Sequence, residues 1–269
     1  MAEARRQARA QLAGCCESPA LEADWLLRHG LGLAAEATLT PAQQTWLAGA
    51  LRRRRAGEPL AYVLGSAGFW SLELTVTPAV LIPRPETEGL VAWALEDLPA
   101  AAEGPLADLG TGSGCIALAL AQERPRLTVW AVDRSAEALG VAQANAARLG
   151  MEARVRPALG DWWAALPSGL RLAGVVSNPP YVAEGDPHLA ALGHEPPAAL
   201  VAGADGLSAL RRLIAEAPAH LRRGAWLRLE HGHDQGAAVR GLLQAAGFAD
   251  IETRRDLAGH ERLSGGWWR

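Results

Sequence analysis

Residues 106–121 read LADLGTGSGCIALALA, and this stretch decides the fold. Its first five residues form a short apolar run that predicts a buried strand, and residues 115–121 predict a helix. Between them, Gly110, Gly112 and Gly114 permit a tight turn and let the backbone approach a ligand where the helix begins. Strand, glycine loop and helix indicate nucleotide binding, although the G-x-G-x-G spacing differs from the G-x-G-x-x-G of dinucleotide folds.

A second predicted strand, residues 127–132, ends in an acid, Asp133. Asp133 lies 19 residues beyond Gly114 (133 − 114), close to the ~20 residues that usually separate a glycine loop from a ribose-binding carboxylate. The alternative is a helix N-cap in front of residues 135–138. The two roles are compatible, and the context favours ribose binding.

The tetrapeptide Asn178-Pro179-Pro180-Tyr181 follows a third apolar run, residues 172–176. Two prolines stiffen the backbone, and neither has an N–H group. The side-chain oxygen of Asn178 and the carbonyl oxygen of Pro179 are therefore expected to accept the two hydrogens of an –NH2 group. Tyr181 is suited to stack on the flat group that carries it. The alternative is an ordinary turn, since Pro-Pro pairs usually mark turns.

From residue 106 onward, predicted strands and helices alternate, which is typical of a doubly wound α/β sheet. Seven strands are expected near residues 106–110, 127–132, 153–158, 172–177, 225–231, 249–256 and 261–268, the last one antiparallel. Helices are expected near residues 114–123, 135–149, 206–222 and 234–246. The glycine loop, the strand-end acid and the Asn-Pro-Pro-Tyr motif together resemble class I S-adenosylmethionine-dependent methyltransferases that act on an amino group.

Three segments are predicted: a helical substrate-docking bundle at 1–66, a β-hairpin linker at 67–83 and the methyltransferase domain at 84–269. Apolar residues recur at helical spacing up to about residue 65, and Thr40-Pro41-Ala42-Gln43 predicts a capped helix start. Residues 69–77 and 80–82 alternate as two hairpin strands. The run Arg52 to Arg55 before Gly57 favours a helix C-terminus, with an acidic partner or RNA as the alternative.

Composition excludes several kinds of chemistry. All basic residues are Arg, so Schiff-base and P-loop lysines are excluded. Three cysteines without metal-ligand spacing indicate a reducing, cytoplasmic setting. His231 and His233 lack further ligands, and no metal is expected. A net charge of −3 predicts no stable nucleic-acid binding, and no apolar run is long enough for a membrane span. A monomer is expected.

Several further segments resemble one family, the peptide chain release factor glutamine N5-methyltransferases (PrmC/HemK). The matching segments are residues 57–62, 81–88, 108–114, 177–181, 195–196, 205–207 and 230–232. The stretch Ile82-Pro83-Arg84-Pro85-Glu86-Thr87-Glu88 separates this family from DNA amino-methyltransferases that share the Asn-Pro-Pro-Tyr motif.

The resemblance implies methyl transfer from S-adenosyl-L-methionine, with S-adenosyl-L-homocysteine as product, to the glutamine of the Gly-Gly-Gln motif in class 1 release factors. It implies that the helical bundle helps to dock the release factor. The residues expected to bind the cofactor are Gly110, Thr111, Gly112, Ser113, Gly114, Asp133, Trp162 and Asn178. Those expected to bind the glutamine are Asn178, Pro179, Pro180, Tyr181, Arg84 and Glu86, and catalysis falls to Asn178, Pro179 and Tyr181.

In the loop after the third strand, Asp161 is expected to accept from the adenine amino group and Trp162 to cover the ring; the alternative for Trp162 is a core aromatic. Three other functions remain open from the residues alone. They are a glutamine methyltransferase of a ribosomal protein, a DNA or RNA amino-methyltransferase, and a non-enzymatic binding module.

Overall fold

A computed structural model describes residues 2–33 and 38–269 of the chain. The chain divides into two compact units between Ala67 and Gly68, and each unit is considered by itself. Residues 1 and 34–37 of the predicted helical segment lie outside the described residues. No helix in the described ranges is both long and apolar enough to cross a membrane.

The first unit is helical, as predicted. Its helices are α1 (Ala2–Leu12), α2 (Pro19–Arg28), α3 (Pro41–Arg55) and α4 (Leu60–Leu64). They enclose a small apolar core that includes Leu12, Leu26, Leu27, Leu47 and Leu51.

The predicted cap and the arginine run both belong to α3. The cap is confirmed, because Thr40 and Gln43 form a reciprocal capping box with Pro41 in the first turn. Arg53 pairs with Glu58, and Arg54 pairs with Glu22 of α2. Two of the four arginines are therefore engaged within the helical unit.

A short hairpin follows, formed by β1 (Ser66–Phe69) and β2 (Leu72–Thr75). Trp70 and Ser71 make the turn, and Trp70 has a positive φ of 57°. The predicted strand at 80–82 is wrong. Pro83 and Pro85 follow this segment, and the Ile82 amide donates to the side chain of Glu195 at 3.0 Å instead of to a neighbouring strand.

Within the described residues, the second unit is built on a seven-stranded sheet of order β5-β4-β3-β6-β7-β9-β8. Among these described strands, β9 alone runs opposite to the other six, so the predicted doubly wound sheet with its antiparallel final strand is confirmed. The strands are β3 (Gly104–Leu109), β4 (Leu127–Asp133), β5 (Val155–Leu159), β6 (Leu172–Ser177), β7 (Leu221–Glu230), β8 (Ala249–Arg255) and β9 (Glu261–Trp268).

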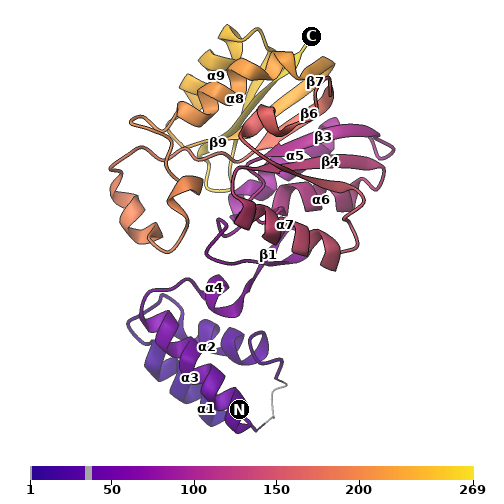
Figure 1. Ribbon diagram of the computed structural model, residues 1–269. Helices are drawn as coiled ribbons and strands as arrows, with labels where there is room; N and C mark the ends of the chain where they lie inside the picture. Colours follow the sequence, from indigo (N-terminus) through magenta and orange to yellow (C-terminus); the bar gives the residue numbers. More distant parts are fainter. Residues whose placement is uncertain (1, 34–37) are drawn as a thin grey trace. The chain divides into compact units, whose positions relative to one another are not determined.

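Helices cover both faces of this sheet (Figure 1). One face packs against α5 (Glu88–Asp97), α6 (Cys115–Glu123) and α7 (Ala136–Arg148), and the other packs against α8 (Ser208–Glu216) and α9 (Gly236–Ala245). Successive strand residues alternate between the two cores: Leu106 and Trp226 face one, whereas Ala107 and Leu227 face the other. A sheet buried on both sides explains the near-continuous apolar strands of the sequence.

The predicted helix at 206–222 is too long. Helix α8 ends at Glu216, a 3-10 turn covers Ala217–Ala219, and β7 already begins at Leu221. Pro218 removes a backbone donor and ends the regular helix. Leu221 then pairs with Leu172 of β6, so β7 is longer at its start than residues 225–231 indicate.

Candidate active site

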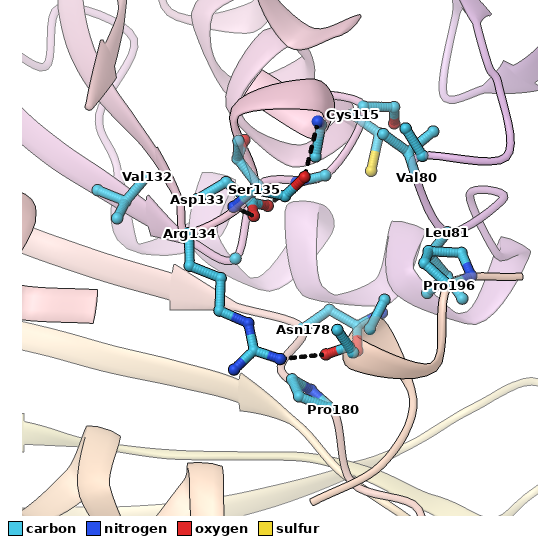
Figure 2. Close-up of a pocket in the computed structure, with 18 of the residues that line it drawn as sticks. Val80, Leu81, Cys115, Val132, Asp133, Arg134, Ser135, Asn178, Pro180 and Pro196 are labelled. Atoms are coloured by element: carbon cyan, nitrogen blue, oxygen red, sulfur yellow. Dashed lines mark hydrogen bonds between the residues drawn. The ribbon is translucent and has the colours of Figure 1, made fainter. Parts of the chain in front are cut away.

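A pocket of the second unit lies at the carboxyl ends of β3, β4 and β6. The chain runs outward from β3 through β4 to β5 and then returns to the other side of β3 at β6. Ligand crevices of doubly wound sheets open at such a reversal. Figure 2 shows residues from the loops around it, among them Val80, Asp133, Asn178 and Pro180.

The structure brings most of the predicted site residues into this pocket. The predicted residues that line it are Arg84, Gly110, Thr111, Gly112, Ser113, Asp133, Trp162, Asn178 and Pro180. Four predicted residues lie outside the lining: Glu86, which is exposed, Gly114, which is the N-cap of α6, Pro179, which is buried, and Tyr181, whose hydroxyl bonds Glu230.

The glycine loop between β3 and α6 is held open by backbone conformations that favour glycine. Gly110, Gly112 and Gly114 have φ values of 78°, 55° and 84°, in the left-handed region where a Cβ atom is unfavourable. A Cβ on Gly110 would come within 3.2 Å of the Trp162 ring, and one on Gly114 within 3.2 Å of Ala142. A Cβ on Gly112 would meet open space, so its positive φ rather than crowding favours glycine there.

Asp133, at the end of β4, holds this loop in place. One carboxylate oxygen accepts from the Gly112 amide at 2.9 Å, and the other accepts from the Ser135 amide at 2.9 Å. The N-cap of α7 is Ser135, whose hydroxyl accepts from the Ala138 amide. Asp133 is therefore not the helix cap, and its remaining lone pairs face the pocket rim, where a ribose hydroxyl would be a suitable donor.

A second acid, Asp108, supports the loop from below. Its side chain is fully buried and accepts from the Thr111 hydroxyl at 2.7 Å and from the Ala117 amide at 3.1 Å. Burial raises its pKa to about 7, against the opposing effect of these two hydrogen bonds. Asp108 thus ties both ends of the glycine loop to β3, a role that sequence reasoning did not assign.

Trp162 and Asp161 follow β5. Trp162 has a positive φ of 51°, a costly conformation for a bulky residue that packing has to enforce. The Asp161 carboxylate pairs with the Arg212 guanidinium of α8. Asp161 lines the pocket, but the expected bond to an adenine amino group would compete with this ion pair.

Asn178 follows β6 and belongs to a buried hydrogen-bond network. Its side-chain nitrogen donates to the Thr87 hydroxyl at 3.0 Å, and that hydroxyl lies 2.7 Å from the Glu230 carboxylate. The Tyr181 hydroxyl donates to the second Glu230 oxygen at 3.2 Å. Thr87 precedes α5, and Glu230 ends β7, so the network joins segments far apart in the sequence.

Glu195 lies in the long loop that follows the Asn-Pro-Pro-Tyr motif, next to Pro196, which lines the pocket. This buried acid accepts from the Ile82 amide and pairs with the Arg84 guanidinium. In the same loop, the Ala198 carbonyl accepts a hydrogen bond from the Arg134 side chain at 3.4 Å, and Figure 2 draws this bond. Arg84 therefore fastens the loop to the segment before α5.

Sequence reasoning assigned no role to Thr87, Glu195 or Glu230. All three lie within segments that carried the family resemblance, and that was the available signal. His231, the next residue along, uses both ring nitrogens in hydrogen bonds, to the Gly232 carbonyl and the Ser264 hydroxyl. Burial lowers its pKa, so the ring is neutral and internal.

These residues suit a nucleoside ligand. The Asp133 carboxylate matches a sugar with hydroxyl groups, and the flat Trp162 side chain matches a base. Asn178 adds an uncharged hydrogen-bonding group beside them.

The chain was compared with known proteins. Residues 92–245 match the methyltransferase small domain family, and residues 3–65 match the PrmC N-terminal domain family. Among solved structures, a 16S rRNA N2 G1207 methyltransferase of T. thermophilus has a TM-score of 0.57 at 20% identity, covering 76% of this chain and 50% of its own. The N-terminal domain of human METTL16 has a TM-score of 0.55 at 15% identity, covering 73% of this chain and 75% of its own. These likenesses show the fold.

Similar sequences with much higher identity carry the name release factor glutamine methyltransferase. The protein of Burkholderia pseudomallei is 50% identical over 92% of this chain and 91% of its own. The protein of Coxiella burnetii is 46% identical over 97% of this chain and 96% of its own. The protein of Pseudomonas aeruginosa is 54% identical over 83% of this chain and 79% of its own. With this identity over nearly the whole length, the chain belongs to the family of release factor glutamine methyltransferases.

Proposed function

We propose that this enzyme transfers a methyl group from S-adenosylmethionine to the side-chain nitrogen of the Gly-Gly-Gln glutamine in class 1 release factors. The observation that carries the proposal is the position of Asn178. It lies in the same pocket as the glycine loop and Asp133, and its amide nitrogen is engaged by Thr87. Its oxygen thereby becomes the group available to a substrate amide.

The cofactor roles follow from the loops around the pocket. Backbone groups of residues 110–113 would hold the amino acid part of the cofactor, Asp133 the ribose and Trp162 the adenine. Gly114 acts indirectly, because it begins α6 and packs against Ala142. When bound, the cofactor supplies a methyl group on a positively charged sulfur, which is already activated for transfer.

The substrate roles centre on positioning. A glutamine amide nitrogen is a poor nucleophile, because its lone pair is delocalised. The oxygens of Asn178 and Pro179 would accept its two hydrogens and hold the nitrogen in line with the methyl group. Such positioning lowers a barrier by up to about 7–11 kcal/mol in favourable cases. Glutamate would leave both acceptors unpaired and is therefore rejected.

The other predicted substrate residues contribute in different ways. Pro180 lines the pocket, and Tyr181 braces Glu230 through its hydroxyl. Arg84 contributes by fastening the loop that holds Pro196. Glu86 is exposed on the turn before α5, where it would meet the release factor rather than the glutamine.

The first 66 residues would dock the release factor, residues 67–83 would act as linker, and residues 84–269 would carry the chemistry. The substrate class implies a cytoplasmic enzyme, and the three unpaired cysteines agree with this. We expect a monomer without stable nucleic-acid binding, in keeping with the net charge of −3. Size-exclusion chromatography with light scattering tests whether the protein is a monomer.

The decisive experiment uses radiolabelled S-adenosylmethionine with a purified class 1 release factor. A second release factor carries alanine in place of the Gly-Gly-Gln glutamine. Label on the first and none on the second is expected. If neither is labelled while the cofactor binds, the proposal fails, and ribosomal proteins and then nucleic acids become the substrates to test.

A further inference from the structure

We propose that Glu230 is a positioning residue that sets the orientation of the Asn178 amide and so makes the site specific for an –NH2 group. The inference rests on the proposed function and deepens it. Glu230 touches neither of the reacting molecules; it acts through Thr87 on Asn178. Three segments that are distant in the sequence meet for this purpose at the carboxyl end of the sheet.

The three groups form a short relay. Glu230 and Thr87 are 1% and 2% exposed, so water does not compete for their hydrogen bonds. The Thr87 hydroxyl lies 2.7 Å from one Glu230 oxygen and 3.0 Å from the Asn178 side-chain nitrogen. Thr87 and Asn178 line the pocket, whereas Glu230 lies behind them.

The chemistry of the groups gives this relay a direction. An ionised carboxylate can only accept hydrogen bonds, so the single Thr87 hydroxyl hydrogen goes to Glu230. The Thr87 oxygen is then left with lone pairs only, and Asn178 must present its –NH2 group to it. The opposite side of the Asn178 amide, its carbonyl oxygen, is therefore the side available to a substrate. A glutamine –NH2 group is the matching donor.

Tyr181 keeps Glu230 in place. Its hydroxyl donates to the other carboxylate oxygen at 3.2 Å, so both oxygens of the acid accept from fixed donors. This gives the motif tyrosine a task inside the protein. The Tyr181 hydroxyl itself stays protonated, because burial and the neighbouring Glu230 raise its pKa.

A side chain at position 230 that can donate a hydrogen bond would no longer fix the orientation of the Thr87 hydroxyl and the Asn178 amide. A glutamine at this position, or protonated Glu230, can give a hydrogen to the Thr87 oxygen. The Thr87 hydroxyl hydrogen is then free to bond the Asn178 oxygen, and the Asn178 amide can turn over. It would present –NH2 to the substrate –NH2, and two donors cannot pair.

This reversal has a pH signature. Burial raises the pKa of Glu230 to about 7, and the charge of Glu86 acts in the same direction. Hydrogen bonds from Thr87 and Tyr181 and the charge of Arg262 oppose this increase. The thiol of Cys115 and the neutral ring of His231 are the other titratable neighbours. Turnover is expected to rise as pH increases through about 7, because the ionised form of Glu230 is the one that works.

The test compares turnover of the release factor by the wild-type enzyme and by Glu230→Gln, Thr87→Val and Thr87→Ser. Glu230→Gln and Thr87→Val are each expected to lower kcat about 100-fold, the scale for a lost positioned hydrogen bond in a water-excluded site. Cofactor affinity, measured by calorimetry, should change less than about threefold, because the relay acts on the substrate amide. Thr87→Ser keeps the hydroxyl and should recover most of the activity that Thr87→Val loses.

Two further readouts separate positioning from mere structural support. The increase of kcat with pH near 7 should be present in the wild type and Thr87→Ser and absent in Glu230→Gln. The double variant Glu230→Gln/Thr87→Val should be no slower than either single variant, since both break one relay. Glu252→Gln, an exposed acid on β8, is the control and should match the wild type.

The outcomes distinguish this inference from the proposed function. A wild-type enzyme that labels no release factor overturns the proposed function and the inference with it. A wild type that labels the release factor, beside Glu230→Gln with equal turnover or an unchanged pH profile, overturns only the role of Glu230. Thr87→Ser as slow as Thr87→Val overturns the relay.

Discussion

At the scale of single residues, the pocket divides its work between two side chains at the ends of β4 and β6, the strands on either side of β3. Asp133 ends β4 and holds the glycine loop, whereas Asn178 follows β6 and faces the reacting group. The first is proposed to act on cofactor binding and the second on turnover. Substitutions at the two positions should therefore affect different constants.

Asn178→Ala should reduce kcat about 100-fold or more, because it removes an acceptor that aligns the substrate nitrogen. The dissociation constant of the cofactor should stay within about tenfold of the wild-type value. Single-turnover methylation and calorimetry measure the two quantities. Wild-type turnover in this variant would remove Asn178 from the mechanism.

Asp133→Ala should weaken cofactor binding by about 1.5–3 kcal/mol, the usual range for hydrogen bonds to a charged group. Part of that loss comes from the Gly112 and Ser135 amides, which lose their acceptor. Asp133→Asn is the matched control, because it keeps one acceptor oxygen, and it should fall between the alanine variant and the wild type. A dissociation constant that does not change in the alanine variant contradicts the ribose role.

At the scale of elements, the turn from β3 to α6 shows why the loop needs glycine at a position outside the pocket lining. Gly114 is the N-cap of α6, with a φ of 84°. A side chain there would be strained and would crowd Leu118 and Ala142 at 3.1 and 3.2 Å. The glycine spacing is thus partly a packing requirement between α6 and α7.

Gly114→Ala should destabilise the second unit by about 1–2 kcal/mol, the cost of a left-handed backbone at a residue with a Cβ atom. Gly140→Ala is the control. This residue is exposed on α7, and the added Cβ would meet nothing within 4 Å. That change should stabilise the protein by up to about 1 kcal/mol. Urea unfolding of both variants decides the point, and equal stabilities would show that φ and packing at Gly114 do not matter.

Strands could be predicted from the sequence where burial determines them. They could not be predicted where a partner that is distant in the sequence determines them. Strands β4 and β6 were predicted to within a residue, because parallel strands buried on both faces are continuously apolar. Residues 80–82 have the same apolar character, but their backbone is paired with Glu195, 113 residues away. The early start of β7 likewise depends on pairing with Leu172. Local pattern carries no information about such partners.

At the scale of the whole molecule, the same limit applies to the site. The glycine loop, Asp133 and Asn178 were found from the sequence because each follows a recognisable strand. Thr87 and Glu230 stand 143 residues apart, and only the folded sheet brings them together. The inward bond of the Tyr181 hydroxyl was equally hidden, because a motif does not say which way a side chain turns.

Two buried acids also make the stability of the protein depend on pH. Burial raises the pKa of Glu230 and of Asp108 to about 7. A carboxyl whose folded-state pKa is raised stabilises the fold below its unfolded pKa, and this contribution is lost as pH rises through the folded value. His220 and His231, whose pKa values burial lowers, change stability in the opposite sense below about pH 6.5. The total pH profile therefore mixes both effects.

Substitution isolates the carboxyl contribution. Glu230→Gln cannot ionise, so its free energy of unfolding relative to the wild type should increase from about pH 4.5 to about pH 7, with a slope of at most about 1.4 kcal/mol per pH unit. Asp108→Asn should behave in the same way, and Glu252→Gln, which is exposed, should run parallel to the wild type. Urea unfolding of each protein between pH 4.5 and pH 8 gives the curves. If Glu230→Gln also ran parallel to the wild type, Glu230 would not be titrating in this range, and the pH signature expected for turnover would have to come from another group.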